Sequence, residues 1–270
     1  MTEQQEIITT FSEMAPRYES LMNNELNKFW GINYRDFIGR LLADISTRED
    51  ELILDIATGT AFIPSFLLDK KLKFRKIIGL DLTYGMLWNW KVRLAENKYE
   101  SQSPLVCASA HQMPFRQDSF DQAICCLATH HMNASTLLTN MNLSLKTSGR
   151  LHIADAGGSS RWKNKMIRLF IKAVAFLYFL FTENYSRAMA ESAAIGNIHT
   201  AQEWEELVKS HGFVDVKIHQ LKSKRFWAPD PIIISKQAGK HFDPMVVKGF
   251  EEIINIEQRS NRKKPSGNIK

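Results

Sequence analysis

The sequence predicts a doubly wound α/β fold: a seven-stranded, mostly parallel sheet with N-terminal helices and a helical lid insertion. Three observations lead to this prediction. After Glu51, continuous apolar runs alternate with helix-like segments, which is typical of a parallel sheet covered on both faces. The first run ends in Asp55 and passes through small residues into a helix after Ala61. The second run ends in Asp81, and the carboxyl ends of such strands meet at one edge of the sheet.

Residues 1–50 are predicted to form a helical cap next to this sheet. The segment 6–45 has the pattern of helices and is rich in aromatic side chains, which are Phe11, Tyr18, Phe29, Trp30, Tyr34 and Phe37. The core, residues 51–236, follows it. Its predicted strands are 52–56, 76–80, 105–108, 121–127 and 150–154, and the helices between them are 61–70, 84–98 and 135–146.

A helical insertion at about residues 160–195 follows the fifth strand and is predicted to act as a lid. The helix after it, 200–210, begins at Thr200 with Glu203 three residues on, which is the spacing of a capping box. Gly212 suits the left-handed position that ends a helix. Strands at 214–221 and 231–235 then complete the sheet. The tail, residues 237–270, is basic and contains a further helical pattern at 244–258.

The composition is that of an ordinary globular protein. The chain has 270 residues, of which 44% are hydrophobic and 24% charged, and its formal net charge is +6. Part of the positive excess lies in segments 70–76 and 259–270. No stripe of interleaved aromatic and basic residues is present, so a nucleic-acid partner is not expected.

Cysteine usage favours a cytoplasmic protein. Cys107, Cys125 and Cys126 lie in apolar, strand-like segments, so buried and reduced thiols are expected. Neighbouring residues of a strand point to opposite faces, so Cys125 and Cys126 cannot share one metal ion, and no metal site is predicted. The first ten residues are polar and lack the apolar core of a signal peptide.

The longest apolar stretch, 166–181, is not expected to span a membrane. Arg168 and Lys172 interrupt it, and its uncharged part is well short of the roughly 20 residues that a crossing needs. Three roles stay open: a packed lid or homo-oligomer contact, a lining for a greasy substrate, or peripheral contact with a membrane surface. The basic residues that would support membrane contact are Arg161, Lys163, Lys165, Arg168 and Lys172.

The turn from Asp55 to Ala61 carries the first chemical signal. Small residues let the backbone approach a ligand closely, and the N–H groups that open the next helix can donate to it. The turn lacks the Gly-x-Gly-x-x-Gly pattern, which favours a nucleoside with a sulfonium or carboxylate over a dinucleotide. Asp81 can accept hydrogen bonds from ribose hydroxyls; its alternative role is a charge at the start of the following helix.

Five motifs in the expected order resemble class I S-adenosylmethionine-dependent methyltransferases, which have a Rossmann-like fold. They lie at residues 55–61, 79–81, 110–115, 118–121 and 145–151. The N-terminal segment from Phe11 to Glu19 and the segment from Trp204 to Phe213 resemble the ubiquinone/menaquinone C-methyltransferase family in particular. The resemblance covers roughly residues 7–236.

The resemblance implies a set of contacts to the methionine and ribose parts of S-adenosylmethionine. Asp55, Ala57 and Gly59 would surround the methionine part, with Asp55 facing its ammonium group. Asp81 would hold the ribose. Tyr18 would close over the site from the N-terminal helix.

The adenine contacts follow from the same resemblance. Leu82 and Met86 would lie against the adenine, Ser109 and Ala110 at its edge, and Leu127 near the sulfonium. Two positions depart from the family pattern. Ser109 replaces an acidic residue that contacts the adenine amino group, and Ala61 replaces a glycine, so its methyl group is expected to crowd the cofactor.

The histidines that follow the fourth strand are the candidate catalytic residues. His130 or His131 could act as a base if the acceptor must lose a proton; orientation of the substrate or a structural role is the alternative. His152, in the fifth strand, is expected to be a hydrogen-bonded core histidine.

The resulting functional prediction is methyl transfer from S-adenosylmethionine to a lipophilic small molecule, with S-adenosylhomocysteine as product. The acceptor would be an aromatic or quinone-like ring, a hydroxyl group or a prenyl-type chain. The alternative is a cofactor-binding protein that does not transfer methyl groups, such as a cyclase or an assembly partner.

Overall fold

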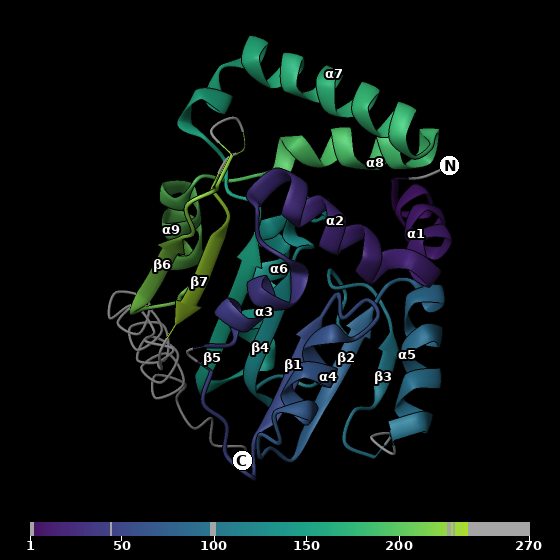
Figure 1. Ribbon diagram of the computed structural model, residues 1–270. Coiled ribbons are helices and arrows are strands. Elements are labelled where there is room, and N and C mark those ends of the chain that lie inside the picture. The colour runs from purple at the N-terminus through teal and green to yellow at the C-terminus, as the bar shows by residue number, and fades with distance from the viewer. Residues whose placement is uncertain (1–2, 44, 98–100, 226–227, 229, 237–270) are drawn as a thin grey trace, which may run out of the picture.

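A computed structural model describes residues 3–43, 45–97, 101–225, 228 and 230–236. A seven-stranded sheet runs through its centre, and helices cover both faces and one end of it (Figure 1). The predicted tail, 237–270, and its helical pattern at 244–258 lie outside the described residues.

The sheet has the order β3-β2-β1-β4-β5-β7-β6. Its strands are β1 (Leu52–Ile56), β2 (Lys76–Asp81), β3 (Leu105–Cys107), β4 (Phe120–Cys126), β5 (Leu145–Asp155), β6 (Val216–Gln220) and β7 (Ile232–Lys236). The strands β1 to β5 run parallel to one another, and β7 is antiparallel to both β5 and β6. Successive strands are added on one side of β1 as far as β3 and on its other side from β4 onward, and open α/β sheets bind ligands at such a switch point. The predicted fold class is confirmed.

The helices are α1 (Glu3–Met14), α2 (Tyr18–Trp30), α3 (Tyr34–Leu41), α4 (Phe62–Asp69), α5 (Tyr84–Asn97), α6 (Ala134–Ser144), α7 (Lys165–Thr182), α8 (Tyr185–Ala194) and α9 (Ala201–Ser210). Short 3-10 turns lie at Ala15–Arg17, Thr129–His131, Ser160–Lys163 and Ile195–Asn197. In Figure 1, α7 and α8 lie above α1 and α2, beyond the end of the sheet. None of the described helices is both long enough and apolar enough to span a bilayer.

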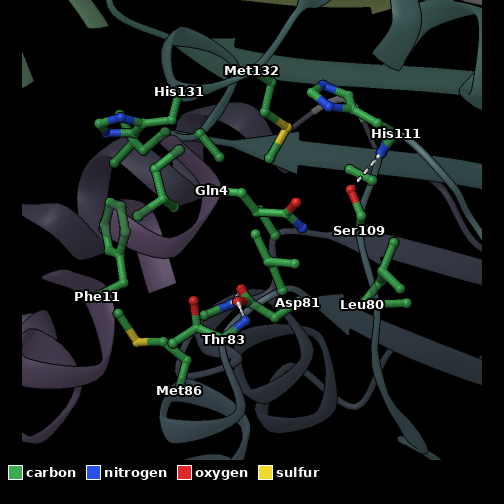
Figure 2. Close-up of a pocket in the computed structure, with 18 of the residues that line it drawn as sticks. Gln4, Phe11, Leu80, Asp81, Thr83, Met86, Ser109, His111, His131 and Met132 are labelled. Atoms are coloured by element: carbon green, nitrogen blue, oxygen red, sulfur yellow. Dashed lines mark hydrogen bonds between the residues drawn. The ribbon is translucent and has the colours of Figure 1, made fainter. Parts of the chain in front are cut away.

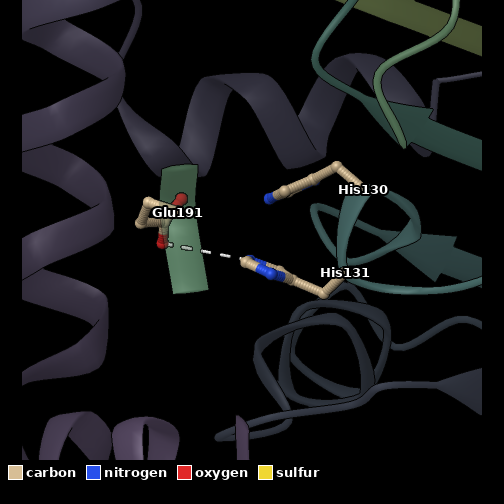
Figure 3. Close-up of side chains that lie close together, drawn as sticks. All are labelled: His130, His131 and Glu191. Carbon is tan, nitrogen blue, oxygen red and sulfur yellow. Dashed lines mark ion pairs between the residues drawn. The ribbon is translucent and has the colours of Figure 1, made fainter. Parts of the chain in front are cut away.

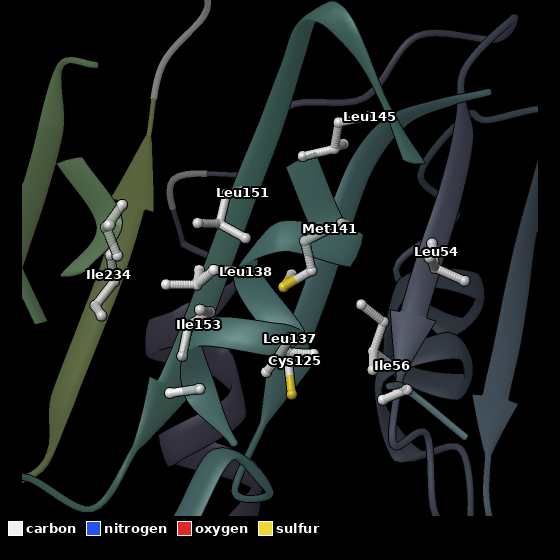
Figure 4. Packing of buried hydrophobic residues seen from close by; sticks show 14 of the residues in the cluster. Leu54, Ile56, Cys125, Leu137, Leu138, Met141, Leu145, Leu151, Ile153 and Ile234 are labelled. Atoms are coloured by element: carbon white, nitrogen blue, oxygen red, sulfur yellow. The ribbon is translucent and has the colours of Figure 1, made fainter. Parts of the chain in front are cut away.

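Alternating strand residues divide the core between the two faces of the sheet. Ile53 packs with α3 and α4, whereas Leu54 points to the other face and packs with α6 and α9. Figure 4 shows the second cluster, in which Leu137 and Met141 of α6 lie against β4 and β5. Because strands buried on both faces need apolar residues throughout, the continuous apolar runs predicted the sheet correctly.

The largest difference from the predicted elements lies at the start of β5. The sequence predicts a helix to residue 146 and a strand from 150, but α6 ends at Ser144 and β5 begins at Leu145. Leu145 pairs with Phe120, and the register then shifts before Gln122 pairs with Arg150. Both predictions for the ends of α9 are confirmed: the Thr200–Glu203 capping box precedes it, and the left-handed Gly212 (φ +79°) follows it.

Candidate active site

A cavity of about 780 Å³ opens at the carboxyl ends of β1, β2 and β4. Its volume lies within the range of small-molecule sites. Figure 2 shows Asp81 and Thr83 on one wall, Ser109 and His111 on a second, and Phe11 and His131 on a third. Helix α1 contributes Phe11, so the N-terminal helices complete the wall that the sheet leaves open.

The turn after β1 takes a left-handed backbone at three positions. Ala57 (φ 54°), Gly59 (φ 56°) and Ala61 (φ 55°) all have positive φ, which costs an alanine roughly 1 kcal/mol relative to its preferred regions. The backbone N–H of Thr58 donates to the carbonyl of Leu80 at 3.0 Å, which fixes the turn to β2. The left-handed turn therefore presents Ala57 and Gly59 to the cavity.

Asp81 lies on the cavity wall and holds the turn in place. Its Oδ2 accepts the backbone N–H of Gly59 at 2.8 Å, and its Oδ1 accepts that of Thr83 at 2.8 Å. Burial raises the pKa of the Asp81 carboxyl, and these hydrogen bonds oppose that rise. Each carboxylate oxygen accepts more than one hydrogen bond, so Asp81 keeps acceptor capacity toward a hydroxyl in the cavity.

Asp55 lies behind the turn and does not line the cavity. Its carboxylate accepts the Thr58 hydroxyl at 2.5 Å, and only 1% of the residue is exposed. Burial raises the pKa of Asp55 to about 7. The Asp55 side chain turns toward Thr58 and away from the cavity, and its contact with a ligand ammonium group stays a prediction.

Ala61 also points away from the cavity, contrary to the expectation that its methyl group crowds a ligand. It is fully buried and packs in a small cluster with Trp90 of α5 and Leu105 of β3. The extra methyl group therefore fills a contact between α5 and the sheet.

Tyr18 covers the turn from the start of α2. A Cβ added at Gly59 would lie 3.8 Å from the Tyr18 ring, so the ring packs directly over the glycine. Thr60 donates its hydroxyl to Glu19 at 2.9 Å, which ties the same end of α2 to the turn. Burial raises the pKa of Tyr18 well beyond its usual range, so the phenol stays neutral and can donate a hydrogen bond.

The remaining predicted cofactor residues also reach the cavity. Leu82, Met86, Ala110 and Leu127 line it, as does Ser109, whose hydroxyl accepts the backbone N–H of His111 at 3.2 Å. In total, nine of the ten predicted cofactor residues line one cavity, and Asp55 is the exception.

The two candidate catalytic histidines occupy different positions. His131 lines the cavity, and the edge of the Phe11 ring packs against it with 5.1 Å between ring centroids. His130 does not line the cavity; its Nδ1 lies 2.6 Å from Oδ1 of Asp155, at the end of β5. The two imidazole rings are 4.2 Å apart, and both extend toward Glu191 of α8 (Figure 3).

The two histidines differ in protonation. Burial and the neighbouring His130 lower the pKa of His131 to about 4, so it is neutral at pH 7. Burial also opposes a charge on His130, but Asp155 outweighs it and raises the pKa of His130. Asp155 further accepts the Thr129 hydroxyl and the backbone N–H of Ala156, and its pKa is lowered despite burial.

A buried arginine of α8 lies next to Glu191 and the two histidines. Arg187, 2% exposed, donates from Nε to Glu191 at 2.8 Å and from Nη2 to both carboxylate oxygens of Glu25 on α2, at 2.9 and 3.0 Å. Burial raises the pKa of Glu25 to about 7, although Arg187 acts against the rise. For Glu191, Arg187 outweighs burial and the pKa is lowered. Glu191 Oε1 lies 3.9 Å from His131 Nε2 (Figure 3).

His130, His131 and Glu191 are also the group of described residues that could hold a metal ion, with ligand atoms within 4.8 Å of one another. Two of those residues already have strong partners, because Glu191 accepts from Arg187 and His130 pairs with Asp155. The guanidinium group supplies the positive charge that a metal would bring. We therefore interpret the cluster as one that sets charge and side-chain orientation next to the cavity.

The sequence analysis did not identify Glu191 or Asp155, nor the ion pairs of Arg187. Arg187 and Glu191 lie in the lid, where the sequence offers no motif, and Arg187 meets a residue 162 positions away. Asp155 ends β5 as Asp81 ends β2, so the strand-end pattern contained a usable signal for it.

His152 lies apart from the site. It is buried within β5, as expected, but neither ring nitrogen has a hydrogen-bond partner among the described residues. Burial lowers its pKa to about 3.

The three cysteines were all expected to be buried. Cys125 is buried and Cys126 is partly buried, but Cys107 is exposed.

Several known proteins are similar in sequence to this chain. The sequence is 29% identical over 171 residues to the ubiquinone/menaquinone biosynthesis C-methyltransferase UbiE of Geobacter sulfurreducens, covering 63% of this chain and 62% of that protein. It is 25% identical over 169 residues to the demethylmenaquinone methyltransferase of Symbiobacterium thermophilum, covering 62% and 63%. An uncharacterized protein of Methanocaldococcus jannaschii, MJ1252, is 28% identical over 141 residues. The chain thus spans about half to two thirds of the length of these relatives.

Solved structures agree on the fold. The geranyl diphosphate C-methyltransferase of Streptomyces coelicolor, solved with Mg²⁺, geranyl diphosphate and S-adenosylhomocysteine, matches with a TM-score of 0.64 at 13% identity, covering 89% of this chain and 99% of that one. A putative methyltransferase of Haloferax volcanii, in complex with the activator Trm112, matches with a TM-score of 0.60 at 14% identity, covering 85% and 97%. The fold is therefore that of S-adenosylmethionine-dependent methyltransferases.

The family assignment rests on the sequence itself. The model of the ubiE/COQ5 methyltransferase family matches residues 1–224, which include the N-terminal helices, the strands β1 to β6 and the lid. This match extends over far more than the nucleotide-binding half of the fold. The chain belongs to the ubiE/COQ5 methyltransferase family.

Proposed function

We propose that this protein transfers a methyl group from S-adenosylmethionine to a lipophilic small molecule. One observation carries the proposal: the Asp81 carboxylate, the left-handed turn and the His131 ring all line the same cavity. An acceptor and a cofactor can therefore meet in one enclosed space, which is the condition for direct transfer.

The residues present fit the cofactor. Ala57 and Gly59 leave room for close approach of the methionine part, and Asp81 would accept the ribose hydroxyls. Leu82 and Met86 offer apolar contact to an adenine ring, with Ser109, Ala110 and Leu127 at its edge and beside the sulfonium. Tyr18 would close over the methionine part. When bound, S-adenosylmethionine supplies a methyl group that is already activated for transfer.

An ammonium contact for Asp55 would need a rearrangement. The carboxylate would have to leave the Thr58 hydroxyl and turn toward the cavity, or accept the ammonium through that hydroxyl. Because the pKa of Asp55 is near 7, a positive ligand group nearby would favour its charged form.

The side of the cavity next to His131 has both apolar and polar lining residues, the polar ones including Gln4 and Asn197. Ile7 and Phe11 of α1 and Met132 after the histidine turn line it, next to His131. Such a surface suits a quinone-like or other aromatic ring, or a prenyl-type chain. The relatives named for ubiquinone and menaquinone biosynthesis support the first of these choices.

His131 is the residue that we place beside the acceptor. Its neutral imidazole could accept a proton from an acceptor hydroxyl, and Glu191 at 3.9 Å would stabilise the resulting charge. His130 does not reach the cavity, and we give it a positioning role through its pair with Asp155.

The test combines binding and product analysis on the full chain. Isothermal titration should give saturable binding of S-adenosylmethionine, and incubation with demethylated quinols should give S-adenosylhomocysteine and a methylated ring. Cofactor binding without product from quinols, phenols or prenyl chains would favour the alternative, a cofactor-binding protein that does not methylate. Absence of binding up to millimolar cofactor would overturn both. Self-association stays a separate prediction, which light scattering can test.

A further inference from the structure

Helix α7 turns an apolar face outward along its whole length. It is the outermost helix in Figure 1 and lies across α8, away from the sheet. The large apolar side chains on this face are each at least half exposed: Met166, Leu169, Phe170, Val174, Leu177 and Phe181. Apart from the adjacent pair Leu169 and Phe170, they are spaced three or four residues apart, which places them on one side of the helix, over about 22 Å.

The charged residues of α7 lie on the opposite side. Arg168 and Lys172 are only partly exposed, and Arg168 donates from Nε to the carbonyl of Trp162 at 3.0 Å. Phe179 is buried under the guanidinium of Arg187, 5.1 Å from its ring centroid. A surface helix normally has the reverse arrangement, with its charges outward. The outer face of α7 is thus built to meet an apolar partner.

Charge distinguishes a membrane from a second copy of the chain. No acidic residue lies between Asp155 and Glu183, so the basic residues at the start of α7 have no acidic neighbour in this segment of the chain. Arg161 and Lys165 are exposed at the N-terminal end of α7. A second copy would bring the same positive charge to the contact, but an anionic lipid surface would neutralise it.

We propose that the outer face of α7 docks the protein on an anionic lipid bilayer, with the helix in the plane of the interface. α7 does not meet the requirements for a membrane span, and an apolar face with flanking basic residues is the pattern of an interfacial helix. Docking would place α7 between the membrane and α8, which carries Arg187 and Glu191 behind the cavity. The inference concerns binding only and does not depend on the proposed methyl transfer.

The chain offers a matched pair of variants to test this. Val174 on α7 and Val92 on α5 are 50% and 49% exposed, so Val174→Asp and Val92→Asp place the same charge on equally exposed sites of two helices. Neither residue lines the cavity. The full chain, without cofactor or acceptor, is co-sedimented with vesicles of phosphatidylcholine alone or mixed with phosphatidylglycerol, and circular dichroism checks the fold of each variant.

Wild type and Val92→Asp should bind the mixed vesicles equally, and Val174→Asp should bind them about tenfold or more weakly, because the carboxylate would enter the interface. The pair Arg161→Gln and Lys165→Gln should weaken binding to mixed vesicles by roughly thirtyfold and change binding to neutral vesicles little. No binding by wild type, or equal losses in the two valine variants, would overturn the proposal. A dimer in light scattering that Val174→Asp dissociates, without vesicle binding, would also overturn it and identify a second copy as the partner.

Discussion

The carboxylate of Asp81 accepts the backbone N–H of Gly59 at 2.8 Å, which joins the end of β2 to the turn after β1. This bond makes the two strand ends one unit, so the residue that would recognise a ribose also shapes the turn that would hold the methionine part. Loss of the carboxylate should affect both.

Asp81→Asn should weaken S-adenosylmethionine binding by about ten- to a hundredfold. The amide keeps one acceptor, but its NH₂ group cannot accept from Gly59 or from a ribose hydroxyl, and hydrogen bonds to charged groups contribute ~1.5–3 kcal/mol. Isothermal titration of the purified variant gives the dissociation constant directly.

Asp121→Asn is the control for this experiment. Asp121 also accepts a backbone N–H, that of Leu52 at 2.9 Å, but it lies at the amino end of β4 and does not line the cavity. Its replacement should leave cofactor affinity unchanged. Wild-type affinity in Asp81→Asn would remove Asp81 from the cofactor site.

Arg187→Met should lower the free energy of unfolding by about 3–5 kcal/mol, because Glu25 and Glu191 would be left without their buried partner. Urea unfolding at pH 7 measures the loss. It should shrink as the pH falls, since removal of Arg187 raises the pKa of both carboxyls and protonation then removes their charge.

Lys73→Met is the control for Arg187→Met, because it removes a cation from an ion pair at the surface. Lys73 and Glu49 form an ion pair at 2.6 Å, but each side chain is 74% exposed. Such pairs contribute at most ~1 kcal/mol, so this variant should unfold almost as wild type does. Equal effects of the two substitutions would contradict a structural role for the Arg187 network.

The parts of the site that could be predicted are those fixed by local sequence. The turn from Asp55 to Ala61 and the acidic end of β2 sit at the edge of the sheet because parallel strands and right-handed crossovers leave no other place for them. The directions of the side chains in this turn could not be predicted from the local sequence. Asp55 and Ala61 are in the predicted turn, yet one bonds to Thr58 and the other packs on Trp90.

The lid could not be predicted in the same way. Arg187 pairs with Glu25 across 162 residues, and nothing in either segment alone marks the pair. The apolar pattern of α7 was visible in the sequence, but which of its faces points outward depends on the packing of Phe179 over α8.

His131→Gln should lower kcat for an acceptor that must lose a proton, with little change in the Kd for S-adenosylmethionine. In the wild type, the base form of His131 is lost as the pH falls through about 4, so kcat should fall on that acidic side. In the variant this acidic limb should disappear. The pH profile of kcat, measured under acceptor saturation, separates the two cases.

His130→Gln provides the comparison for that profile. Because His130 lies outside the cavity and pairs with Asp155, its loss should reduce kcat and leave an acidic limb that belongs to His131. That limb should move to higher pH, because His130 no longer lowers the pKa of His131. If His131→Gln keeps wild-type kcat with a hydroxylated acceptor, the role of His131 as a base is wrong.

His152→Leu should stabilise the protein more at pH 5 than at pH 7. The pKa of His152 falls from 6.5 to about 3 on folding, so below pH 6.5 the unfolded chain binds a proton that the folded chain does not. At pH 5 this difference costs the wild type ~2 kcal/mol, which leucine avoids. Urea unfolding at both pH values measures it. An equal effect of His152→Leu at both would mean that His152 gains a partner or water on protonation.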